Sequence, residues 1–162
     1  MTAQVLDRVV TCYRIGDPTG AFPIFDDSGS TLYPGRWNTA SSPIVYTSEY
    51  YSTALLEKLA HSSGILPPNQ HYIEITIPNR LTYEILTEAS LPGWDNATPA
   101  VSKQHGEKWQ QEQRSLILFV PSVIARVDRN ILINRHHPEA RHIQWSLHQP
   151  VWWDARLFGS FP

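Results

Sequence analysis

Short apolar runs separated by polar, proline-containing connections set the pattern of this 162-residue chain. Alternating or continuous apolar stretches of a few residues predict strands. The clearest is the continuous run at 116–120, which is bounded by Arg114-Ser115 and Pro121. In chain order, we expect strands at 8–15, 44–46, 71–77, 81–86, 116–120, 131–134 and 151–158.

One segment has a helical pattern instead. Tyr51, Leu55 and Leu59 recur every four residues, which predicts a helix that ends near His61. The preceding Thr47-Ser48 pair supplies the candidates for its N-cap.

A second helix is predicted from Thr98 to about Arg114, with Thr98 as N-cap and Pro99 at the first helical position. It is polar over most of its length, and Val101 and Trp109 are its few apolar anchors. This pattern is typical of a surface helix.

The segment 17–34 is rich in Gly, Pro, Asp and Ser, which predicts a long loop. Long loops are uncommon unless they have a function. Because this one leads directly into Gly35-Arg36-Trp37-Asn38, we expect it to flank a functional site.

Composition restricts the class of protein. The N-terminus lacks a signal-peptide pattern and no apolar run approaches the roughly 20 residues of a membrane helix, so we expect one cytoplasmic domain over 1–162. The net charge of −2 argues against direct nucleic-acid binding.

Cys12 is the only cysteine, which excludes an internal disulfide, and its apolar neighbours indicate a buried, inert thiol. Arginine outnumbers lysine, which suits recognition of a diphosphate or carboxylate.

Single residues indicate little chemistry by themselves. The chain has no glycine-rich dinucleotide motif and no Walker A loop. Pro138 interrupts the histidine cluster at 136–142, so we expect no metal. Glu57 faces away from the leucine stripe, where a solvated helix glutamate is the plainer interpretation. Tyr46 and Ser122, each at a strand end, also fit ordinary core and turn positions.

Several spaced motifs, taken together, resemble the RES domain, a toxin family usually paired with an Xre-type antitoxin. Agreement of several motifs in order is more specific than any one of them. The matching segments span nearly the whole chain and are Tyr13-Arg14-Ile15, Gly35-Arg36-Trp37-Asn38, Ile44-Val45-Tyr46-Thr47-Ser48, Ala54-Leu55-Leu56-Glu57, Val120-Pro121-Ser122, Ile133-Asn134 and His137-Pro138.

The resemblance implies an α+β fold, with compact mixed or antiparallel sheets and flanking helices, similar to the ADP-ribosyltransferase toxins. It also implies an enzyme with NAD as substrate and no prosthetic group. Some family members degrade NAD by hydrolysis or phosphorolysis, and others transfer ADP-ribose to a protein such as phosphoribosyl pyrophosphate synthetase. A non-enzymatic binding domain with an aromatic-lined cleft is the alternative from a different class.

The chemistry of NAD suggests a role for each matched residue. Nicotinamide leaves as a neutral ring, so the site must mainly stabilise positive charge on the ribose, and Glu57 is the candidate carboxylate. Arg14 and Arg36 suit the diphosphate, unless they pair with an acid such as Asp26 or Asp27. The set of expected catalytic and NAD-binding residues is completed by Tyr46 against the nicotinamide or its ribose, Ser122 hydrogen-bonded to Glu57 or the ribose, and Asn134.

The resemblance further implies a helix-turn-helix antitoxin of the Xre type, whose C-terminal segment blocks the cleft. A transferase would need a protein acceptor as well. Neither a membrane nor direct contact with nucleic acid is expected. An exposed tryptophan near 151–158 would suit an interface with another protein.

Overall fold

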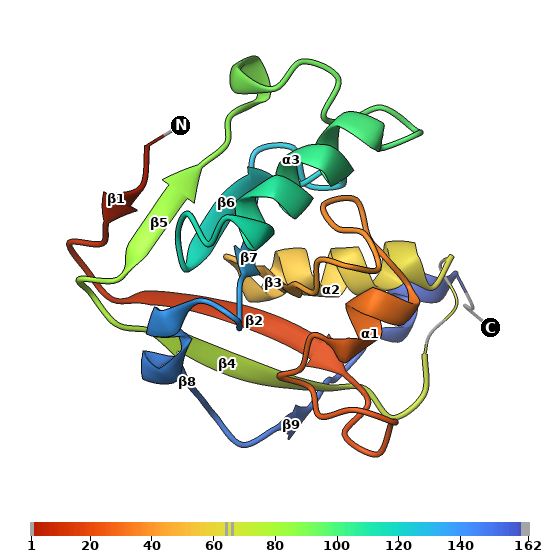
Figure 1. The fold of residues 1–162 in the computed structure, drawn as a ribbon. Coiled ribbons are helices and arrows are strands. Elements are labelled where there is room, and N and C mark those ends of the chain that lie inside the picture. The colour runs from red at the N-terminus through yellow and green to blue at the C-terminus, as the bar shows by residue number, and fades with distance from the viewer. Residues whose placement is uncertain (1, 64, 66, 160–162) are drawn as a thin grey trace.

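The computed structural model describes residues 2–63, 65 and 67–159 (Figure 1). The described residues form an α+β fold, as the resemblance predicted. Its strands are β1 (Gln4–Val5), β2 (Val10–Gly16), β3 (Val45–Ser48), β4 (His71–Ile77), β5 (Thr82–Ile85), β6 (Ile117–Pro121), β7 (Arg129–Ile133), β8 (Gln144–Trp145) and β9 (Gln149–Pro150). Its helices are α1 (Ser28–Leu32), α2 (Tyr51–His61) and α3 (Ala100–Gln111), with 3-10 turns η1 (Glu88–Ser90), η2 (Pro138–His142) and η3 (Ala155–Phe158).

The strands form one sheet in the order β1-β5-β6-β7-β3-β2-β4-β8, with β9 also on β4. Among the described strands, β5 and β6 run parallel and the other pairs are antiparallel. β2 pairs with β4 over its whole length, but it meets β3 at the single pair Tyr13↔Ser48. The two halves of the sheet therefore diverge between β2 and β3 (Figure 1).

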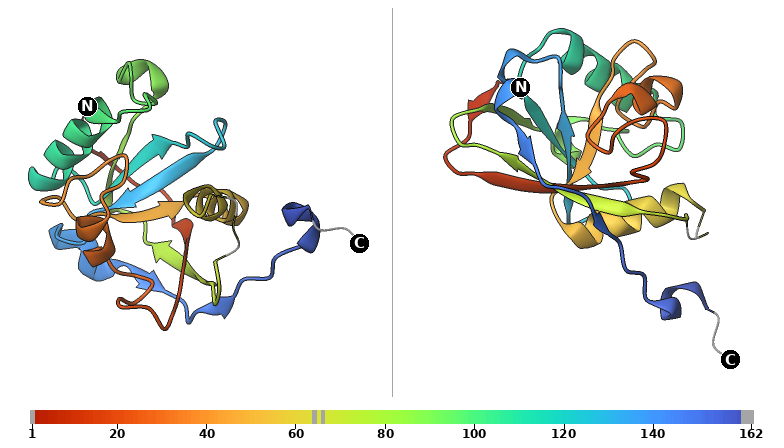
Figure 2. Two further views of the ribbon diagram at one scale, coloured as in Figure 1. Left: turned by 90° about the vertical axis from the view of Figure 1, so that its right-hand side faces the viewer. Right: turned by 90° about the horizontal axis from the view of Figure 1, so that it is seen from below.

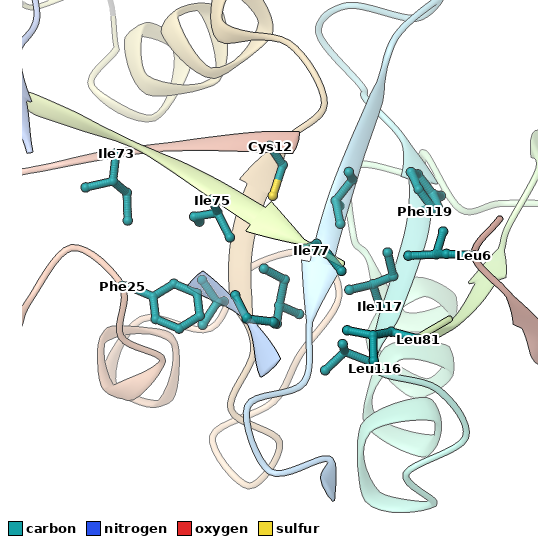
Figure 3. Close-up of a cluster of buried hydrophobic side chains, with 14 of the residues drawn as sticks. Leu6, Cys12, Phe25, Ile73, Ile75, Ile77, Leu81, Leu116, Ile117 and Phe119 are labelled. Atoms are coloured by element: carbon teal, nitrogen blue, oxygen red, sulfur yellow. The ribbon is translucent and has the colours of Figure 1, made fainter. Parts of the chain in front are cut away.

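Two apolar clusters pack against the sheet. One contains Ile117 and Phe119 of β6 together with side chains from β2, β4 and β7 (Figure 3). The other contains Leu118 and Val120 of the same strand and lies next to α3. Successive side chains of a strand point to opposite faces, so β6 is buried on both. This explains why its sequence is continuously apolar.

Helix α3 is less exposed than a surface helix should be. Trp109 is fully buried and its indole nitrogen donates to the Ser115 hydroxyl at 2.8 Å. Gly106 lies so close to the Trp37 carbonyl oxygen that a Cβ atom would be 1.8 Å from it. Val101 is not a core anchor, because it lies on the exposed side of the helix. The helix buries small residues as well as large ones, which the apolar periodicity alone cannot show.

The beginnings of both longer helices differ from the prediction. Thr47 and Ser48 belong to β3, and α2 begins after an N-cap at Tyr50 that makes no side-chain cap. Pro99 occupies the N-cap of α3, so Thr98 does not cap it. Neither helix therefore begins at a residue whose side chain caps it.

The predicted loop 17–34 contains the short helix α1. Its sequence, SGSTL, has no apolar period and low helix propensity, so the pattern gave no signal. Contacts from outside hold it instead. Asp26 Oδ1 accepts from Ser28 N at 2.7 Å, and the Ser30 hydroxyl accepts from Ile44 N at 3.0 Å.

The prediction of a strand at 151–158 is wrong. After β9 the chain leaves the sheet and ends its described part in the turn η3, whose N-cap Asp154 accepts from Arg156 N (Figure 2). Trp152 is 78% exposed on this arm. An apolar run forms a strand only where another strand can pair with its backbone hydrogen-bonding groups. The exposed tryptophan agrees with the expectation of one near 151–158, and its interface role stays a prediction.

Candidate active site

A cavity of about 850 Å³ lies where the sheet halves diverge. This volume is within the range of about 300–1,000 Å³ that is usual for small-molecule sites. One wall is α2, the opposite wall is formed by the turn 33–37 and the start of α3, and β2, β3 and Asn130 of β7 line it further. Both members of the single β2–β3 pair, Tyr13 and Ser48, line it too.

Glu57 faces this cavity rather than open solvent. Ala54, Glu57, Lys58 and His61 line it from α2, and this spacing places them on one helix face. Thr53 fixes the helix from a neighbouring position, since its hydroxyl donates to Asp128 Oδ2 at 2.6 Å. Glu57 is the one acidic side chain among the described residues that line the cavity.

The Glu57 carboxylate is held through a single oxygen. Ser122 Oγ donates to Glu57 Oε1 at 2.8 Å, which is the hydrogen bond expected between these residues. Asn130 Nδ2 donates to the same oxygen at 2.6 Å. Within the described part of the chain, Oε2 has no hydrogen-bond donor. The carboxylate is therefore fixed in orientation and keeps one oxygen for a ligand.

Both donors are themselves oriented. Ser122 is buried just past β6, and its oxygen accepts from the backbone N–H groups of Ile124 at 3.3 Å and Ala125 at 3.0 Å. Its hydroxyl proton is thereby directed to Glu57. Asn130 Oδ1 accepts from Ser48 Oγ at 2.8 Å, which turns its amide nitrogen toward the carboxylate.

Asn130 was missed by the sequence prediction. It lies in β7 opposite Ser48 of β3, but the predicted strand began one residue later, at 131. The signal lay in the motif Ile44-Val45-Tyr46-Thr47-Ser48, because a serine at the end of a buried strand requires a polar partner. Only the register of β3 against β7 shows which residue that partner is.

Tyr46 lines the cavity, and its hydroxyl holds the neighbouring turn in shape. It donates to Asn38 Oδ1 at 2.8 Å and accepts from Trp37 N at 3.0 Å. Burial raises the pKa of Tyr46 above its ordinary value, so the phenol stays neutral. Gly35 is required beside it, because a Cβ atom there would lie 2.8 Å from the Tyr46 ring.

Arg36 extends from this turn into the cavity. Its Nη1 donates to the carbonyl oxygens of Trp94 at 2.9 Å and Asn96 at 2.8 Å. Among the described residues, no carboxylate pairs with it and its Nε and Nη2 have no acceptor. One side of the guanidinium is therefore anchored, and the other side keeps the fork of donors that suits a phosphate.

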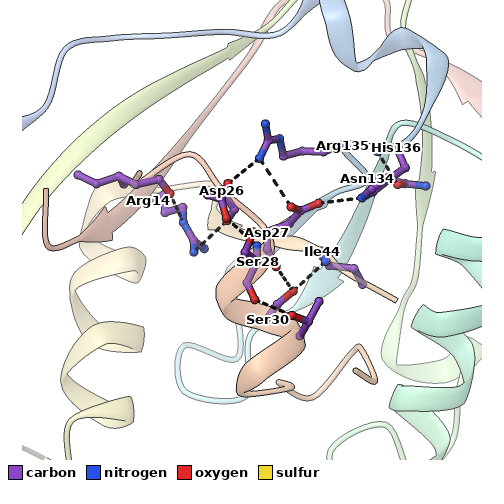
Figure 4. Close-up of polar contacts among 11 residues, drawn as sticks. Arg14, Asp26, Asp27, Ser28, Ser30, Ile44, Asn134, Arg135 and His136 are labelled. Atoms are coloured by element: carbon purple, nitrogen blue, oxygen red, sulfur yellow. Dashed lines mark hydrogen bonds and ion pairs between the residues drawn. The ribbon is translucent and has the colours of Figure 1, made fainter. Parts of the chain in front are cut away.

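Arg14 also lines the cavity, but its donors serve the protein backbone (Figure 4). Nε donates to Ile24 O at 2.6 Å, Nη1 to Tyr46 O at 2.7 Å and Nη2 to Asp26 O at 3.4 Å. Burial lowers the pKa of Arg14, and the nearby Asp26 and Asp27 carboxylates oppose this shift. Arg14 ties β2 to β3 and to the segment before α1. Its contact with NAD stays a prediction.

Among the described residues, neither Arg14 nor Arg36 makes the alternative ion pair with Asp26 or Asp27, and Asn134 does not line the cavity. Asp26 and Asp27 pair with Arg135, at 3.1 Å and 3.6 Å, rather than through their carboxylates with Arg14 or Arg36 (Figure 4). Asn134 is fully buried away from the cavity, and its Nδ2 donates to Gln110 O at 2.9 Å. The structure thus places Asn134 outside the cavity, where it supports the start of the next turn by accepting from His136 N at 3.1 Å.

The other polar groups considered for chemistry have structural surroundings. Over the ranges that the structure describes, no three His, Cys, Asp or Glu side chains are arranged to hold a metal. Burial raises the pKa of the Cys12 thiol to about 12, in agreement with the expected inert thiol. No described helix has the length and apolar character to cross a membrane.

Known proteins resemble the chain over most of its length. The family model of the RES domain matches residues 11–154. The Prs ADP-ribosylating toxin of Sphingobium sp. is 40% identical over 138 residues, which cover 82% of this chain and 81% of that protein. Toxin Res of Pseudomonas putida is 31% identical over 143 residues, which cover 85% of this chain and 95% of that protein.

A solved structure has the same fold. It is a chain in the crystal structure of the M. tuberculosis MbcT-MbcA toxin-antitoxin complex, with a TM-score of 0.70 at 14% identity, over 91% of this chain and 86% of that chain. At this identity the likeness concerns the fold alone. The family match and the two relatives show that this chain belongs to the RES domain family, as its motifs predicted.

Proposed function

We propose that the chain is a toxin that consumes NAD by breaking the bond between nicotinamide and ribose. The observation that carries this proposal is the fixed carboxylate of Glu57, which has one free oxygen on the wall of a cavity whose other charged side chains are cations. The names of the relatives, which include a Prs ADP-ribosylating toxin, support the same substrate class.

The site fits what this bond requires. The nicotinamide nitrogen is cationic before cleavage, so the ring leaves neutral and no general acid is needed. Positive charge develops on the ribose, and a carboxylate beside it lowers the barrier. Glu57 Oε2 is the free atom for this task, while Ser122 and Asn130 keep the carboxylate from rotating.

Arg36 is the group for the diphosphate. Its anchored side sets its direction, and its remaining donors meet phosphate oxygens as charge-assisted bonds of about 1.5–3 kcal/mol each. Two hydrogen bonds hold the neutral hydroxyl of Tyr46, which fixes the position of its ring in the cavity. The ring can therefore serve as the surface on which nicotinamide or its ribose is held.

The acceptor of the ADP-ribose defines the second candidate function. Water or phosphate makes the protein an NAD-degrading enzyme, whereas a protein side chain makes it a mono-ADP-ribosyltransferase. The printed name of the Sphingobium relative favours the second. Phosphoribosyl pyrophosphate synthetase is the acceptor to test first.

The experiment is to incubate the purified chain with NAD, with and without phosphate and with a bacterial lysate, and to identify the products. ADP-ribose with nicotinamide indicates hydrolysis, a phosphorylated ADP-ribose indicates phosphorolysis, and label on a lysate protein indicates transfer. Glu57→Gln is the inactive control. An unchanged amount of NAD, with no labelled protein, would remove the proposal and favour a non-enzymatic binding domain.

We also propose that an antitoxin of the Xre type occupies the same cavity. The fold likeness to a toxin solved with its antitoxin supports a protein partner. A peptide from the antitoxin's C-terminal segment should compete with NAD for the Glu57→Gln protein. Simultaneous binding of both would place the partner elsewhere.

A further inference from the structure

Lys58 is a cation on the α2 wall of the cavity, the wall to which Glu57 also belongs. The two side chains are consecutive on the face of α2 that lines the cavity, and Lys58 is half-buried there. Arg36 and Lys103 line it from the turn 33–37 and from α3. The cavity therefore has cations on both walls, and the one on α2 directly follows the candidate carboxylate in the sequence.

The charge of Lys58 is not neutralised by the protein. In the described part of the chain, no acidic side chain lies within salt-bridge distance of its ammonium, and no hydrogen bond holds it. Burial lowers the pKa of Lys58, and the nearby positive charge of Arg14 lowers it further, against a weaker opposing effect of Asp17. Retaining a desolvated cation beside another cation is unfavourable unless an anion binds there.

Arg14 differs from Lys58 in this respect. Backbone carbonyl oxygens surround its guanidinium and replace the water that it loses. Lys58 has no such substitute among the described residues, and a flexible ammonium is a strong ligand for a phosphate. Lys58 and Glu57 line the same cavity, so an anion bound to Lys58 shares that cavity with the candidate carboxylate.

We propose that Lys58 binds a phosphate group in the cavity that Glu57 also lines, and thereby sets the affinity for an anionic reactant. This inference rests on the proposed function. The phosphate belongs either to the diphosphate of NAD or to a free phosphate ion. In the second case, a phosphate oxygen forms a bond to the ribose carbon as the bond to nicotinamide breaks, and the electron pair of that bond returns to the departing ring.

The test compares Lys58→Gln and Lys58→Arg with a matched control, Lys108→Gln. Lys108 is an exposed lysine on α3 whose ammonium lies 3.9 Å from Glu112, outside the cavity. Steady-state rates are measured while NAD is varied and, separately, while phosphate is varied. Binding of inorganic pyrophosphate and of inorganic phosphate is measured by calorimetry, which does not depend on turnover.

Lys58→Gln loses one charge-assisted bond, so we expect either the KM for NAD or the KM for phosphate to rise by about tenfold to a hundredfold. Lys58→Arg should recover part of this loss, and Lys108→Gln should show no change. A rise in the KM for NAD, with weaker pyrophosphate binding, assigns the diphosphate. A rise confined to the KM for phosphate assigns the attacking ion.

Unchanged KM values and unchanged binding of both anions in a folded Lys58→Gln protein would overturn the inference while leaving the proposed function intact. If Lys58→Gln does not fold, Lys58→Met replaces it in the same measurements. If the parental chain does not consume NAD, the proposed function fails, and calorimetry alone decides whether Lys58 binds a phosphate group.

Discussion

Glu57 is the residue on which the proposed chemistry depends most directly. Glu57→Gln keeps the size and both hydrogen-bonding partners but removes the negative charge. We expect kcat to fall by about 10²–10⁴, as for other single electrostatic groups, with an unchanged unfolding midpoint. The exposed Glu88→Gln is the matched control. NAD consumption at the parental rate in Glu57→Gln would show that this carboxylate is not catalytic.

Asn130 acts through Glu57 and should have a smaller effect. Asn130→Ala removes one of two donors to Glu57 Oε1 and leaves the Ser48 hydroxyl without its acceptor. A hydrogen bond to a charged group contributes about 1.5–3 kcal/mol, so kcat should fall by about tenfold to a hundredfold. The fall should be mainly in kcat, because Asn130 orients the carboxylate. A rise in KM for NAD alone would show instead that Asn130 binds the substrate.

Arg36 should affect binding as well as rate. Arg36→Ala removes the free donors that face the cavity, so KM for NAD should rise while kcat falls. Arg141→Ala, at an exposed arginine of η2, is the control for loss of charge. An unchanged KM in a folded Arg36→Ala protein would contradict phosphate binding by this side chain.

The contact between α3 and the turn 33–37 is the element on which the second wall of the cavity depends. Gly106→Ala would place a methyl group 1.8 Å from the Trp37 carbonyl oxygen, so the helix must move away from Trp37 and from the adjacent Arg36. We expect the unfolding free energy to fall by about 3 kcal/mol, which is the upper end of the usual loss for an overpacked substitution. Activity should also be reduced. Urea unfolding at neutral pH measures the first effect.

Gly29→Ala is the comparison for stability. No atom lies within 4 Å of a Cβ built at Gly29, which is in α1, so alanine should be neutral or stabilising by up to about 1 kcal/mol. Equal stability losses in Gly29→Ala and Gly106→Ala would mean that the close contact with Trp37 is not what determines the cost.

These elements also show what the sequence can and cannot predict. Periodicity found the interior of α2 and the strands β2, β4, β5, β6 and β7, because each buries a regular face. It missed α1, whose polar residues are held by Asp26 and Ile44 from outside, and it predicted a strand at 151–158, where the described chain contains the turn η3 instead. Apolar periodicity reports the burial of a regular face, whereas α1 depends on polar contacts with its neighbours, and a strand at 151–158 would depend on a pairing partner.

The site residues that belong to the matched motifs could be predicted from the sequence. The matched segments contained five expected site residues that the structure brings to one cavity or to its wall: Arg14, Arg36, Tyr46, Glu57 and Ser122. Asn134 came from the same source and lies elsewhere. Asn130 and Lys58 were not found, since their importance depends on strand register and on the direction of a helix face.

The molecule as a whole should lose stability in mild acid partly through His105. Burial lowers the pKa of His105 to about 4 from its ordinary 6.5, and the Arg114 charge adds to the shift. In mild acid the unfolded chain therefore binds a proton at His105 that the folded chain does not bind. The resulting contribution to the unfolding free energy is fully present above pH 6.5 and declines as the pH falls toward 4. Its Nε2 atom is buried with no partner among the described residues, which fits a neutral ring.

His105→Gln removes this titration at the same position. Between pH 7 and pH 5, we expect the unfolding free energy of the variant to fall less than that of the parental protein, as measured by urea titration at each pH. His142→Gln, at an exposed ring, is the matched control. Identical pH dependence in His105→Gln and the parental chain would mean that other groups cause the acid loss.

The single carboxylate in the described lining of the cavity also limits how an acceptor is activated. If Glu57 is engaged with the charge on the ribose, no second carboxylate there is available to take a proton from a neutral acceptor. Among the described lining residues, His61 is then the side chain of the kind that most often takes a proton, so a neutral acceptor such as water would depend on it. An anionic acceptor needs no deprotonation and would not, so the two kinds of acceptor should differ in whether they need this base.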